Sequence, residues 1–487
     1  MKVLQIASEC TPIIKTGGLA DVVGSLPKAL LAYGVEAKVA LPLYEEIGDK
    51  FGHQLKAVSS GSINFQGNEH PYSVFKGVLA EGDIEVYLFQ NDEFLSKGEI
   101  YYSEDTPHRQ KQSTRRFAFF SRAVVDFFTN ISDWKPDVMH CHDWHAGIVP
   151  HLVKNEYKQD TKTIFTIHNL AMQGVSDLDI LSILGHDRRI PDHDIDWDAE
   201  DGNIVLLLQG ILAADIINTV SPSYAYEITT PQFGEGLDKV LQKNKHKLFG
   251  IINGLDYEVW DPKTDEFVFH QYELRGEEVG DIREKKFRNK VDLLAEMAVR
   301  TDEDLSQLPM MGIVSRLTRQ KGFQLLEEIK SYLLEQKDFT LMVLGTGDDD
   351  IERWLNTWEQ ESPYIIFENK FDEGLAHQIY AASDMFLIPS KFEPCGLTQM
   401  ISMKYGAIPI VSAVGGLKDT VIPNVNGYVF EEFTGTALLE TMKQAVHEYH
   451  ENKIWDKLVH KALQADFSWN VSAKQYYLLY QKLVGQL

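Results

Sequence analysis

A lysine and two adjacent glycines follow the first strand-like segment of the chain, where together they would bind an anion. The apolar run Val3–Ala7 leads into Lys15, Gly17 and Gly18, after which a helical pattern begins. Free N–H groups at a helix N-terminus attract anions, glycine lets a ligand approach the backbone, and lysine adds a positive charge. The spacing fits neither the dinucleotide fingerprint nor the P-loop, so an ordinary glycine turn is the alternative interpretation.

A second set of candidate ligand-binding residues lies in the other half of the chain. Arg316 ends a strand-like run, and Lys321 comes just before a helical pattern. Glu393 and the segment Gly396–Thr398 follow another strand-like run, and Glu393 is either a ligand carboxylate or a helix cap. A basic pair, an acid and a cluster of backbone amides at the carboxyl ends of one sheet favour ligand binding.

Histidines surround one cysteine in a third segment that at first resembles a metal site. His140 and His142 alternate with Cys141, and Asp143 follows. On a strand, alternate side chains point to opposite faces, so the two histidines point one way and the cysteine the other. Four converging ligands are therefore not expected, and the sequence predicts no metal site here.

Alternating strands and helices must position these residues. Near-continuous apolar runs are typical of parallel strands that are buried on both faces, and their alternation with helical patterns predicts doubly wound α/β sheets. With 487 residues the chain is long enough for two such domains, divided near Phe249–Gly254 and facing each other across a cleft. The predicted strands are Val35–Leu41, Ile84–Phe89, Val138–Cys141, Thr163–Ile167, Ile216–Val220, Met311–Val314, Thr340–Leu344, Tyr364–Phe367, Met385–Ile388 and Ile408–Val411.

Charge and composition exclude several classes of partner. The net charge is −25, from 47 basic and 72 acidic residues, which disfavours nucleic acid and anionic membranes as partners. No apolar run is long enough to cross a bilayer, and no signal-peptide pattern opens the chain. Cys10, Cys141 and Cys395 are few and scattered, which indicates a reducing cytoplasm. No motif indicates an oligomeric state.

A series of motifs resembles the bacterial glycogen and starch synthase family. The motifs occur in the family's order and span nearly the whole chain, so the match is highly specific. They are Lys15–Leu19, His140–Trp144, Thr166–Leu170, Ile252–Asp256, Ser315–Leu317 with Lys321–Gly322, Phe392–Gln399, Gly415–Thr420 and Phe467–Trp469.

The resemblance implies a retaining glucosyltransferase of the GT-B fold, with two facing Rossmann-like domains. That family transfers glucose from ADP-glucose to the non-reducing 4-hydroxyl of an α-1,4-glucan such as glycogen, with no metal or cofactor. The acceptor-side domain would cover residues 1–249 and the nucleotide-sugar domain residues 250–466. The terminal helix, residues 467–487, would pack back onto the first domain.

The resemblance also implies roles for individual residues. The expected catalytic residues are His168, Glu393, Arg316, Lys321 and Asp143, the last beside the acceptor oxygen. ADP and its phosphates would be contacted by Lys15, Gly18, Arg316, Lys321, Gly396, Leu397 and Thr398, and Phe371 would stack on adenine. The glucose would be contacted by His168, Asn253 and Glu393, with Tyr101 near the active site.

Other activities on the same fold remain as alternatives. A related transferase would use UDP-glucose or another acceptor such as glucose 1-phosphate, because no motif here separates adenine from uracil. A non-catalytic regulator that binds glycan or nucleotide is a second alternative, which the intact charged residues disfavour. Ile401 stands where many retaining relatives have a second glutamate, which fits the synthase subgroup. Met172 replaces a common aromatic and Thr346 a common serine, and neither change touches the expected diphosphate contacts.

Overall fold

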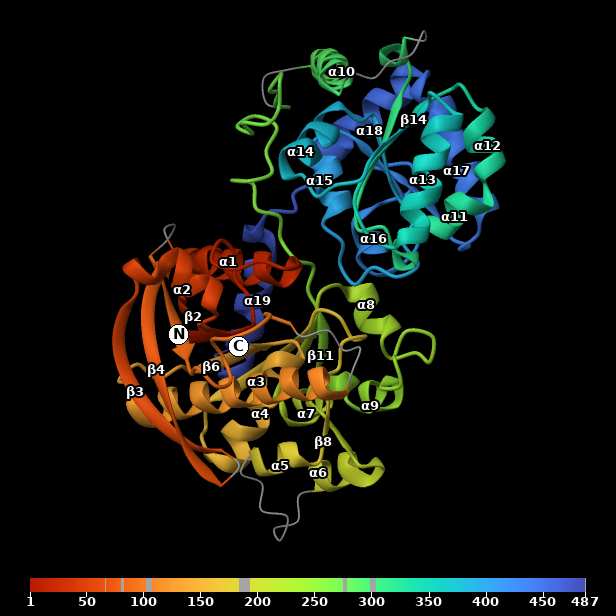
Figure 1. The fold of residues 1–487 in the computed structure, drawn as a ribbon. Helices are drawn as coiled ribbons and strands as arrows, with labels where there is room; N and C mark the ends of the chain where they lie inside the picture. Colours follow the sequence, from red (N-terminus) through yellow and green to blue (C-terminus); the bar gives the residue numbers. More distant parts are fainter. Residues whose placement is uncertain are drawn as a thin grey trace. The chain divides into compact units, whose positions relative to one another are not determined.

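Two compact units make up the chain. The computed structural model describes residues 1–65, 67–79, 83–101, 107–183, 193–274, 278–297 and 304–486. Unit 1 comprises Met1–Gly254 and Trp469–Leu487, and unit 2 comprises Leu255–Ser468. The chain thus passes between units after Gly254 and after Ser468, where the sequence predicted limits after 249 and 466. Figure 1 shows the two units, and Leu487 lies outside the described residues.

Unit 1 is built on one mixed sheet whose strands run in the order β11-β10-β7-β6-β1-β2-β5-β4-β3. The strands from β11 to β5 are parallel, whereas β4 pairs antiparallel with both β5 and β3. The described strands of this sheet are β1 Lys2–Ile6, β2 Glu36–Pro42, β3 Lys56–Phe65, β4 Asn68–Leu79, β5 Ile84–Gln90, β6 Val138–His142, β7 Lys162–Ile167, β10 Ile216–Thr219 and β11 Leu248–Gly250. A separate antiparallel pair is formed by β8 Val175–Asp177 and β9 Asn203–Val205.

The helices of unit 1 include the C-terminal helix α19, which packs beside α1 (Figure 1). Val22, Leu26 and Leu30 of α1 share one core with Ala473 and Tyr480 of α19. The described α-helices are α1 Gly18–Leu30, α2 Glu45–Phe51, α3 Pro107–Asp126, α4 Val149–His151, α5 Asp179–Ile183, α6 His193–Asp198, α7 Leu206–Ala213, α8 Pro222–Glu227, α9 Asp238–Lys243 and α19 Trp469–Leu483. Short 3-10 helices span Leu31–Tyr33, Gly52–Gln54, Trp144–Ala146, Ala199–Asp201 and Lys245–Lys247, and π-helical turns span Phe127–Ile131 and Leu152–Glu156.

Unit 2 is built on a parallel sheet with strand order β14-β13-β12-β15-β16-β17. Its described strands are β12 Met310–Val314, β13 Thr340–Leu344, β14 Ile365–Glu368, β15 Met385–Ile388, β16 Ile408–Ser412 and β17 Tyr428–Phe430. Its described α-helices are α10 Val279–Glu296, α11 Phe323–Glu328, α12 Lys330–Glu335, α13 Asp349–Glu361, α14 Glu373–Ala382, α15 Thr398–Lys404, α16 Gly415–Thr420, α17 Gly435–Tyr449 and α18 Asn452–Gln464. Short 3-10 helices span Leu305–Gln307 and Arg319–Lys321.

Both units confirm the α/β class that the sequence predicts. The predicted parallel strands are present, with ends that shift by a residue or so, because their apolar runs are buried on both faces of a sheet. The sequence reading missed the antiparallel strands β3 and β4, whose residues are mostly polar and exposed or half-buried. Among the described residues, no helix is both long and apolar enough to cross a membrane.

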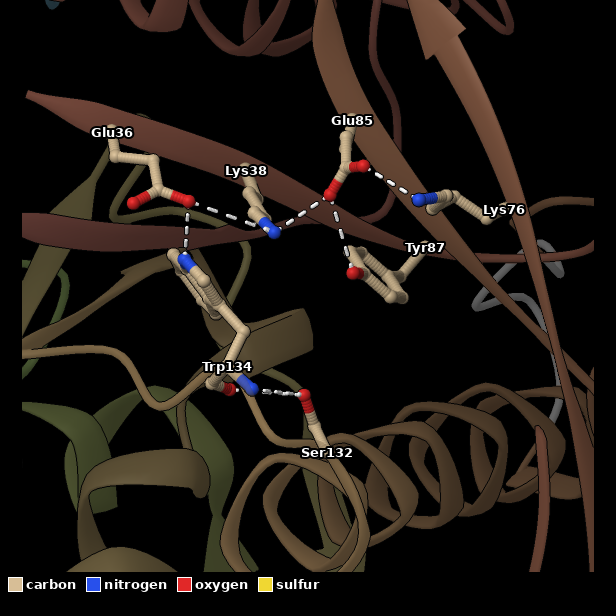
Figure 2. Close-up of polar contacts among 7 residues, drawn as sticks. All are labelled: Glu36, Lys38, Lys76, Glu85, Tyr87, Ser132 and Trp134. Atoms are coloured by element: carbon tan, nitrogen blue, oxygen red, sulfur yellow. Dashed lines mark hydrogen bonds and ion pairs between the residues drawn. The ribbon is translucent and has the colours of Figure 1, made fainter. Parts of the chain in front are cut away.

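A cluster of charged residues joins the parallel part of the first sheet to its antiparallel extension (Figure 2). Glu85 on β5 accepts from Lys38 of β2 and from Lys76 of β4, with both N–O distances 2.6 Å. Lys38 Nζ lies 4.5 Å from the centre of the Trp134 ring, and Trp134 Nε1–H donates to Glu36 at 2.6 Å. One carboxylate therefore links three neighbouring strands.

Replacing Glu85 with glutamine is expected to lower the free energy of unfolding by about 1–3 kcal/mol at neutral pH. Burial alone would raise the pKa of Glu85, but its bonds to Lys38 and Lys76 outweigh that and lower the pKa to about 2. A depressed folded-state pKa stabilises the fold above the unfolded value, and this stabilisation is lost as pH falls toward 2.

Urea denaturation of the wild type and the Glu85→Gln variant from pH 7 to pH 3 measures this difference. The difference in unfolding free energy between the two proteins should become smaller as pH falls. Glu46→Gln is the matched control, because Glu46 pairs with Lys50 on an exposed helix face, where ion pairs contribute little. A difference in unfolding free energy that stays constant with pH would contradict the stabilising role of the Glu85 carboxylate.

Candidate functional site

Ligands of open α/β sheets bind at the carboxyl ends of strands, where the strand order reverses. In unit 1 that point lies between β1 and β6, because the chain continues from β1 to β2 on one side and returns to β6 on the other. In unit 2 it lies between β12 and β15. The segments that follow β1, β6, β12 and β15 carry most of the predicted site residues.

Glu9 anchors the loop after β1 through hydrogen bonds. This residue was not singled out in the sequence analysis. The Glu9 carboxylate accepts from the backbone N–H groups of Thr16, at 2.5 Å, and Gly17, at 2.9 Å. The N–H of Gly18, the first residue of α1, donates to no other described residue. Two of the amides near the helix start are therefore already occupied, whereas the Gly18 N–H is available to an anion.

The glycines of this loop are not required by the fold. Gly17 has an extended backbone with φ of −148°, which any residue adopts. A Cβ at Gly18 would meet no atom within 4 Å, so the space in front of it is open. Lys15 reaches Asp21 with an N–O distance of 2.8 Å, and its side chain is half exposed. The loop keeps an uncovered backbone and a lysine on one side, as an anion site needs.

Asp143 and His168 meet at the carboxyl ends of β6 and β7. Asp143 Oδ1 accepts from the backbone N–H of His168 at 2.7 Å and from that of Asn169 at 3.4 Å. Asp143 has a φ of 55° with ψ of −178°, a region that side chains rarely occupy and that costs about 1–3 kcal/mol. Strain of this kind concentrates at functional sites, and here it turns a buried carboxylate toward the strand ends.

Activity is expected to rise as pH increases through about 7, because the role expected of Asp143 beside the acceptor oxygen needs its second carboxylate oxygen unprotonated while Oδ1 accepts from His168 and Asn169. Burial raises the pKa of the Asp143 carboxyl to about 7, although the N–H groups of His168 and Asn169 oppose this. A kcat profile from pH 5.5 to 9 measures the ionisation, and Asp143→Asn should flatten this limb while lowering kcat.

Stability provides an independent readout of the same group. A raised folded-state pKa stabilises wild type below the unfolded value, and this contribution is lost as pH rises through about 7. Asp143→Asn should therefore gain stability relative to wild type between pH 5 and pH 8. A wild-type kcat profile without this ionisation would contradict the role.

Two further predicted site residues belong to unit 1, and one of them has a buried polar atom without a partner among the described residues. Tyr101 OH lies 2.7 Å from Ser8 Oγ and 3.1 Å from Glu9 Oε1, so this ring is tied to the loop after β1. Asn253 is buried, yet its Oδ1 has no hydrogen-bond partner among the described residues. A buried oxygen without a partner is costly unless a ligand or water donates to it.

The histidines of β6 form hydrogen bonds inside unit 1. The rings of His140 and His142 stack at 4.3 Å, which confirms that both point to the same side of the strand. His140 contacts Tyr480 and Thr166, whereas His142 contacts Gln5 and His168. Among the described residues, no group of three or more His, Cys, Asp or Glu side chains is arranged to hold a metal ion.

In unit 2 the predicted lysine and glutamate are in direct contact. Lys321 Nζ lies 2.7 Å from Glu393 Oε2, and both side chains are mostly buried. Ser390 Oγ also donates to Glu393 Oε2, at 3.0 Å. Arg316 is exposed, and its guanidinium forms no hydrogen bond or ion pair with another described residue. This corner of unit 2 thus combines one paired and one unpaired cation.

Close backbone contacts shape the turn that carries Glu393. Gly322 has a φ of +83°, and a Cβ there would lie 1.8 Å from the carbonyl oxygen of Pro389, so only glycine fits. Gly415 is similarly required, because its Cβ would lie 2.0 Å from the carbonyl oxygen of Glu393. Gln399 Nε2 donates to the carbonyls of Cys395 and Gly396 and closes the turn before α15. These contacts fix the backbone conformation of the turn.

The backbone N–H groups that follow this turn are placed where they could bind an anion. The backbone N–H groups of Gly396 and Leu397 donate to no other described residue, and α15 begins at Thr398. Helix starts attract negative charge. Lys321, Ser390 and Thr398 also line a small pocket at the carboxyl ends of β12 and β15. Phe371, in the loop after β14, is 92% exposed.

The structure distributes the predicted residues over the two units. Unit 1 carries Lys15, Gly18, Tyr101, Asp143, His168 and Asn253, and unit 2 carries Arg316, Lys321, Glu393, Gly396, Leu397 and Thr398. Direct contacts join Asp143 to His168 and Lys321 to Glu393. Sequence reasoning missed Glu9, Ser390 and Gln5. Glu9 and Ser390 directly follow predicted strands, and that position was the signal available for them.

Two family models match most of the chain. Residues 2–243 match the family model described as starch synthase catalytic domain, and residues 301–461 match glycosyl transferases group 1. Glycogen synthase of Clostridium beijerinckii is 39% identical over 100% of both chains, and that of Thermotoga maritima is 36% identical, also over 100% of both.

Solved structures show the same relationship. The catalytic domain of starch synthase IV from Arabidopsis thaliana, bound to ADP and acarbose, superposes with a TM-score of 0.85 at 32% identity over 99% of both chains. Sucrose-phosphate synthase from Thermosynechococcus elongatus covers 100% of both chains with a TM-score of 0.61 at 17% identity, which is a likeness of fold.

Proposed function

The chain belongs to the glycogen and starch synthase family of GT-B glycosyltransferases, and from this membership we propose that its donor is ADP-glucose and its acceptor an α-1,4-glucan. The enzyme is a hexosyltransferase that makes glycogen. The related starch synthase IV structure contains ADP and acarbose, which supports an adenine nucleotide and a glucan as ligands here.

The observation that carries the proposal is the cationic corner of unit 2. Exposed Arg316, the mostly buried Lys321 and the amides of Gly396 and Leu397 surround the carboxyl ends of β12 and β15. The protein as a whole has a net charge of −25, so these cations lie in an otherwise acidic protein. Arginine binds phosphate with two parallel hydrogen bonds, and lysine supplies a point charge.

The reaction follows from these groups. The bond between glucose C1 and the phosphate oxygen breaks, and a bond from C1 to the acceptor 4-oxygen forms. Negative charge grows on the leaving phosphate, so Arg316 and Lys321 stabilise the transition state more than the bound donor. We propose that the acceptor attacks from the face the phosphate leaves, and that its proton passes to the departing phosphate, which retains the anomeric configuration.

Other groups position the sugar in this proposal. Glu393 and Asn253 bind hydroxyls of the transferred glucose, His168 steadies the cationic sugar, and Asp143 lies beside the acceptor oxygen. Burial lowers the pKa of His168 to about 3, so the ring is neutral at physiological pH and does not repel the cationic sugar. No residue is assigned as a covalent nucleophile.

We further propose that the reaction needs no metal or cofactor and takes place in the cytoplasm. The positive charge that a metal would supply to the diphosphate is available from Arg316 and Lys321. The three cysteines are buried and form no disulfide, which suits a reducing compartment.

Transfer of radiolabelled glucose to glycogen tests the proposal directly. ADP-glucose and UDP-glucose are compared in parallel, with and without EDTA, and the product is digested with an amylase specific for α-1,4 bonds. We expect transfer from ADP-glucose, unchanged by EDTA and released by the amylase. Preference for UDP-glucose would mean that UDP-glucose, and not ADP-glucose, is the donor. Glycogen binding without transfer from either donor would favour the regulator or another acceptor.

A further inference from the structure

Buried hydrogen bonds connect the C-terminal helix to His168 through the interior of unit 1. His142 Nδ1 lies 2.9 Å from His168 Nε2, and His142 Nε2 lies 2.7 Å from Gln5 Oε1. The Gln5 amide nitrogen donates to Tyr480 OH of α19 at 3.2 Å. Gln5, His142 and Tyr480 are each fully buried. None of the three is among the predicted site residues, yet their hydrogen bonds connect them to one of those residues, His168.

Each of these groups has a hydrogen-bonding role that its neighbour dictates. The Gln5 oxygen only accepts, so the proton of a neutral His142 ring is on Nε2. The Nδ1 of His142 is then a lone pair that accepts from His168 Nε2–H. A neutral His168 protonated on Nε2 keeps Nδ1 unprotonated, and that atom has no partner among the described residues.

We infer that Gln5, His142 and Tyr480 are positioning residues for the transfer reaction, which fix the Nε2–H form of His168 and so present its Nδ1 lone pair to the donor sugar. This inference rests on the proposed function for its purpose, since His168 is expected at the transferred glucose. An N–H aimed at the cationic sugar would repel it, whereas a lone pair attracts it and accepts from a sugar hydroxyl.

Tyr480 bonds the nitrogen side of the Gln5 amide. Because Tyr480 OH accepts from the Gln5 nitrogen, its own proton is free to reach His140 Nδ1, 2.7 Å away. His140 Nε2–H then donates to Thr166 Oγ1, also at 2.7 Å. With its nitrogen facing Tyr480 in this structure, the amide presents its oxygen to His142. The terminal helix thus acts on the site through hydrogen bonds as well as through packing.

Burial keeps the hydrogen-bonded histidine rings neutral. Burial lowers the pKa of His140 to about 3 and that of His142 well below its usual value. No ring in the chain therefore gains a second proton near neutral pH, and the order of donors and acceptors persists. Such fixed orientation of a site histidine by the group behind it is a general means of tuning its chemistry.

Long-range ¹H–¹⁵N spectra of protein labelled at histidine nitrogens test the inference without reference to activity. The His168 signals are identified by their loss in His168→Gln. We expect the wild type to show His168 protonated on Nε2 and bare on Nδ1 from pH 6 to pH 8. Protonated Nδ1 would mean that the Gln5 amide faces the other way, and it would overturn the inference.

Two variants of His142 connect the protonation pattern to turnover. His142→Leu removes the acceptor, so His168 should lose its single form and kcat should fall roughly 10- to 100-fold, with KM little changed. His142→Asn places an amide oxygen where Nδ1 was, so it should keep the Nε2–H form and most of kcat. Equal losses in both variants with an unchanged His168 spectrum would show a merely structural role.

Tyr480→Phe is the smallest of these changes, because it removes one oxygen. It frees the Gln5 amide to turn, so His168 should show both forms, and kcat should fall less than in His142→Leu. If His168 keeps its single protonated form in this variant, Tyr480 is not a positioning residue. His151→Leu, another buried histidine of unit 1, is the control, with thermal unfolding as the measure of folding. If wild type transfers no glucose, the proposed function fails while the His168 spectrum still decides the hydrogen-bond order.

Discussion

Replacing Lys321 with alanine is expected to lower kcat by about 10²–10³-fold, the loss seen when one donor to a developing negative charge is removed. In the free protein Lys321 Nζ contacts Glu393 at 2.7 Å, at the carboxyl ends of β12 and β15. In the proposed reaction the same ammonium group contacts the diphosphate of the donor. Because charge builds on the phosphate only as the C1–O bond breaks, the loss should appear in kcat.

Arg316 should behave similarly, with one difference. Arg316→Ala is expected to reduce kcat by about the same factor, and Arg316→Lys should recover only part of it, since lysine does not bind phosphate with two parallel hydrogen bonds. Arg319→Ala is the control: Arg319 belongs to the same turn but pairs with Asp350 at the surface. Initial rates across both substrates separate kcat from KM, and losses confined to KM would contradict a transition-state role.

The second large effect is expected at Glu393. Replacing Glu393 with glutamine should lower kcat/KM for the donor by about 10- to 100-fold, because a charged acceptor for the glucose hydroxyls is lost. ADP carries no glucose, so its affinity should not fall. Glu393 also pairs with Lys321 in the free protein, and removing that competitor should leave ADP binding equal or tighter.

Titration calorimetry with ADP, alongside donor kinetics, separates these effects. Glu361→Gln is a matched control, since Glu361 is half exposed and lies 3.9 Å from Lys330 on the surface of the same unit. A clear loss of ADP affinity in Glu393→Gln would mean that Glu393 organises the nucleotide site. An unchanged kcat/KM would remove Glu393 from the sugar site altogether.

The arrangement of strands and helices was readable from the sequence because it depends on near neighbours along the chain. Runs such as Thr340–Leu344 and Met385–Ile388 are apolar at every position, and the structure has strands β13 and β15 with those bounds. The antiparallel strands β3 and β4 were not readable, because one face of an edge hairpin is solvated and its apolar signal is weak.

The positions of the charged residues were also determined by sequence. Lys15, Arg316, Lys321 and Glu393 each follow a strand, and parallel strands place all such segments at the same edge of their sheet. The motifs were sufficient to identify the family, which the matches over the whole chain confirm.

Tertiary structure alone decided which side chains meet. Glu9 occupies two amides of the glycine loop, Lys321 pairs with Glu393, and Gln5 stands behind His142. Gln5 and Tyr480 are 475 positions apart in the chain, so no local pattern relates them. Backbone preference and apolar period are properties of neighbouring residues, whereas a hydrogen bond between distant side chains exists only after the sheet has formed and the terminal helix has packed against it.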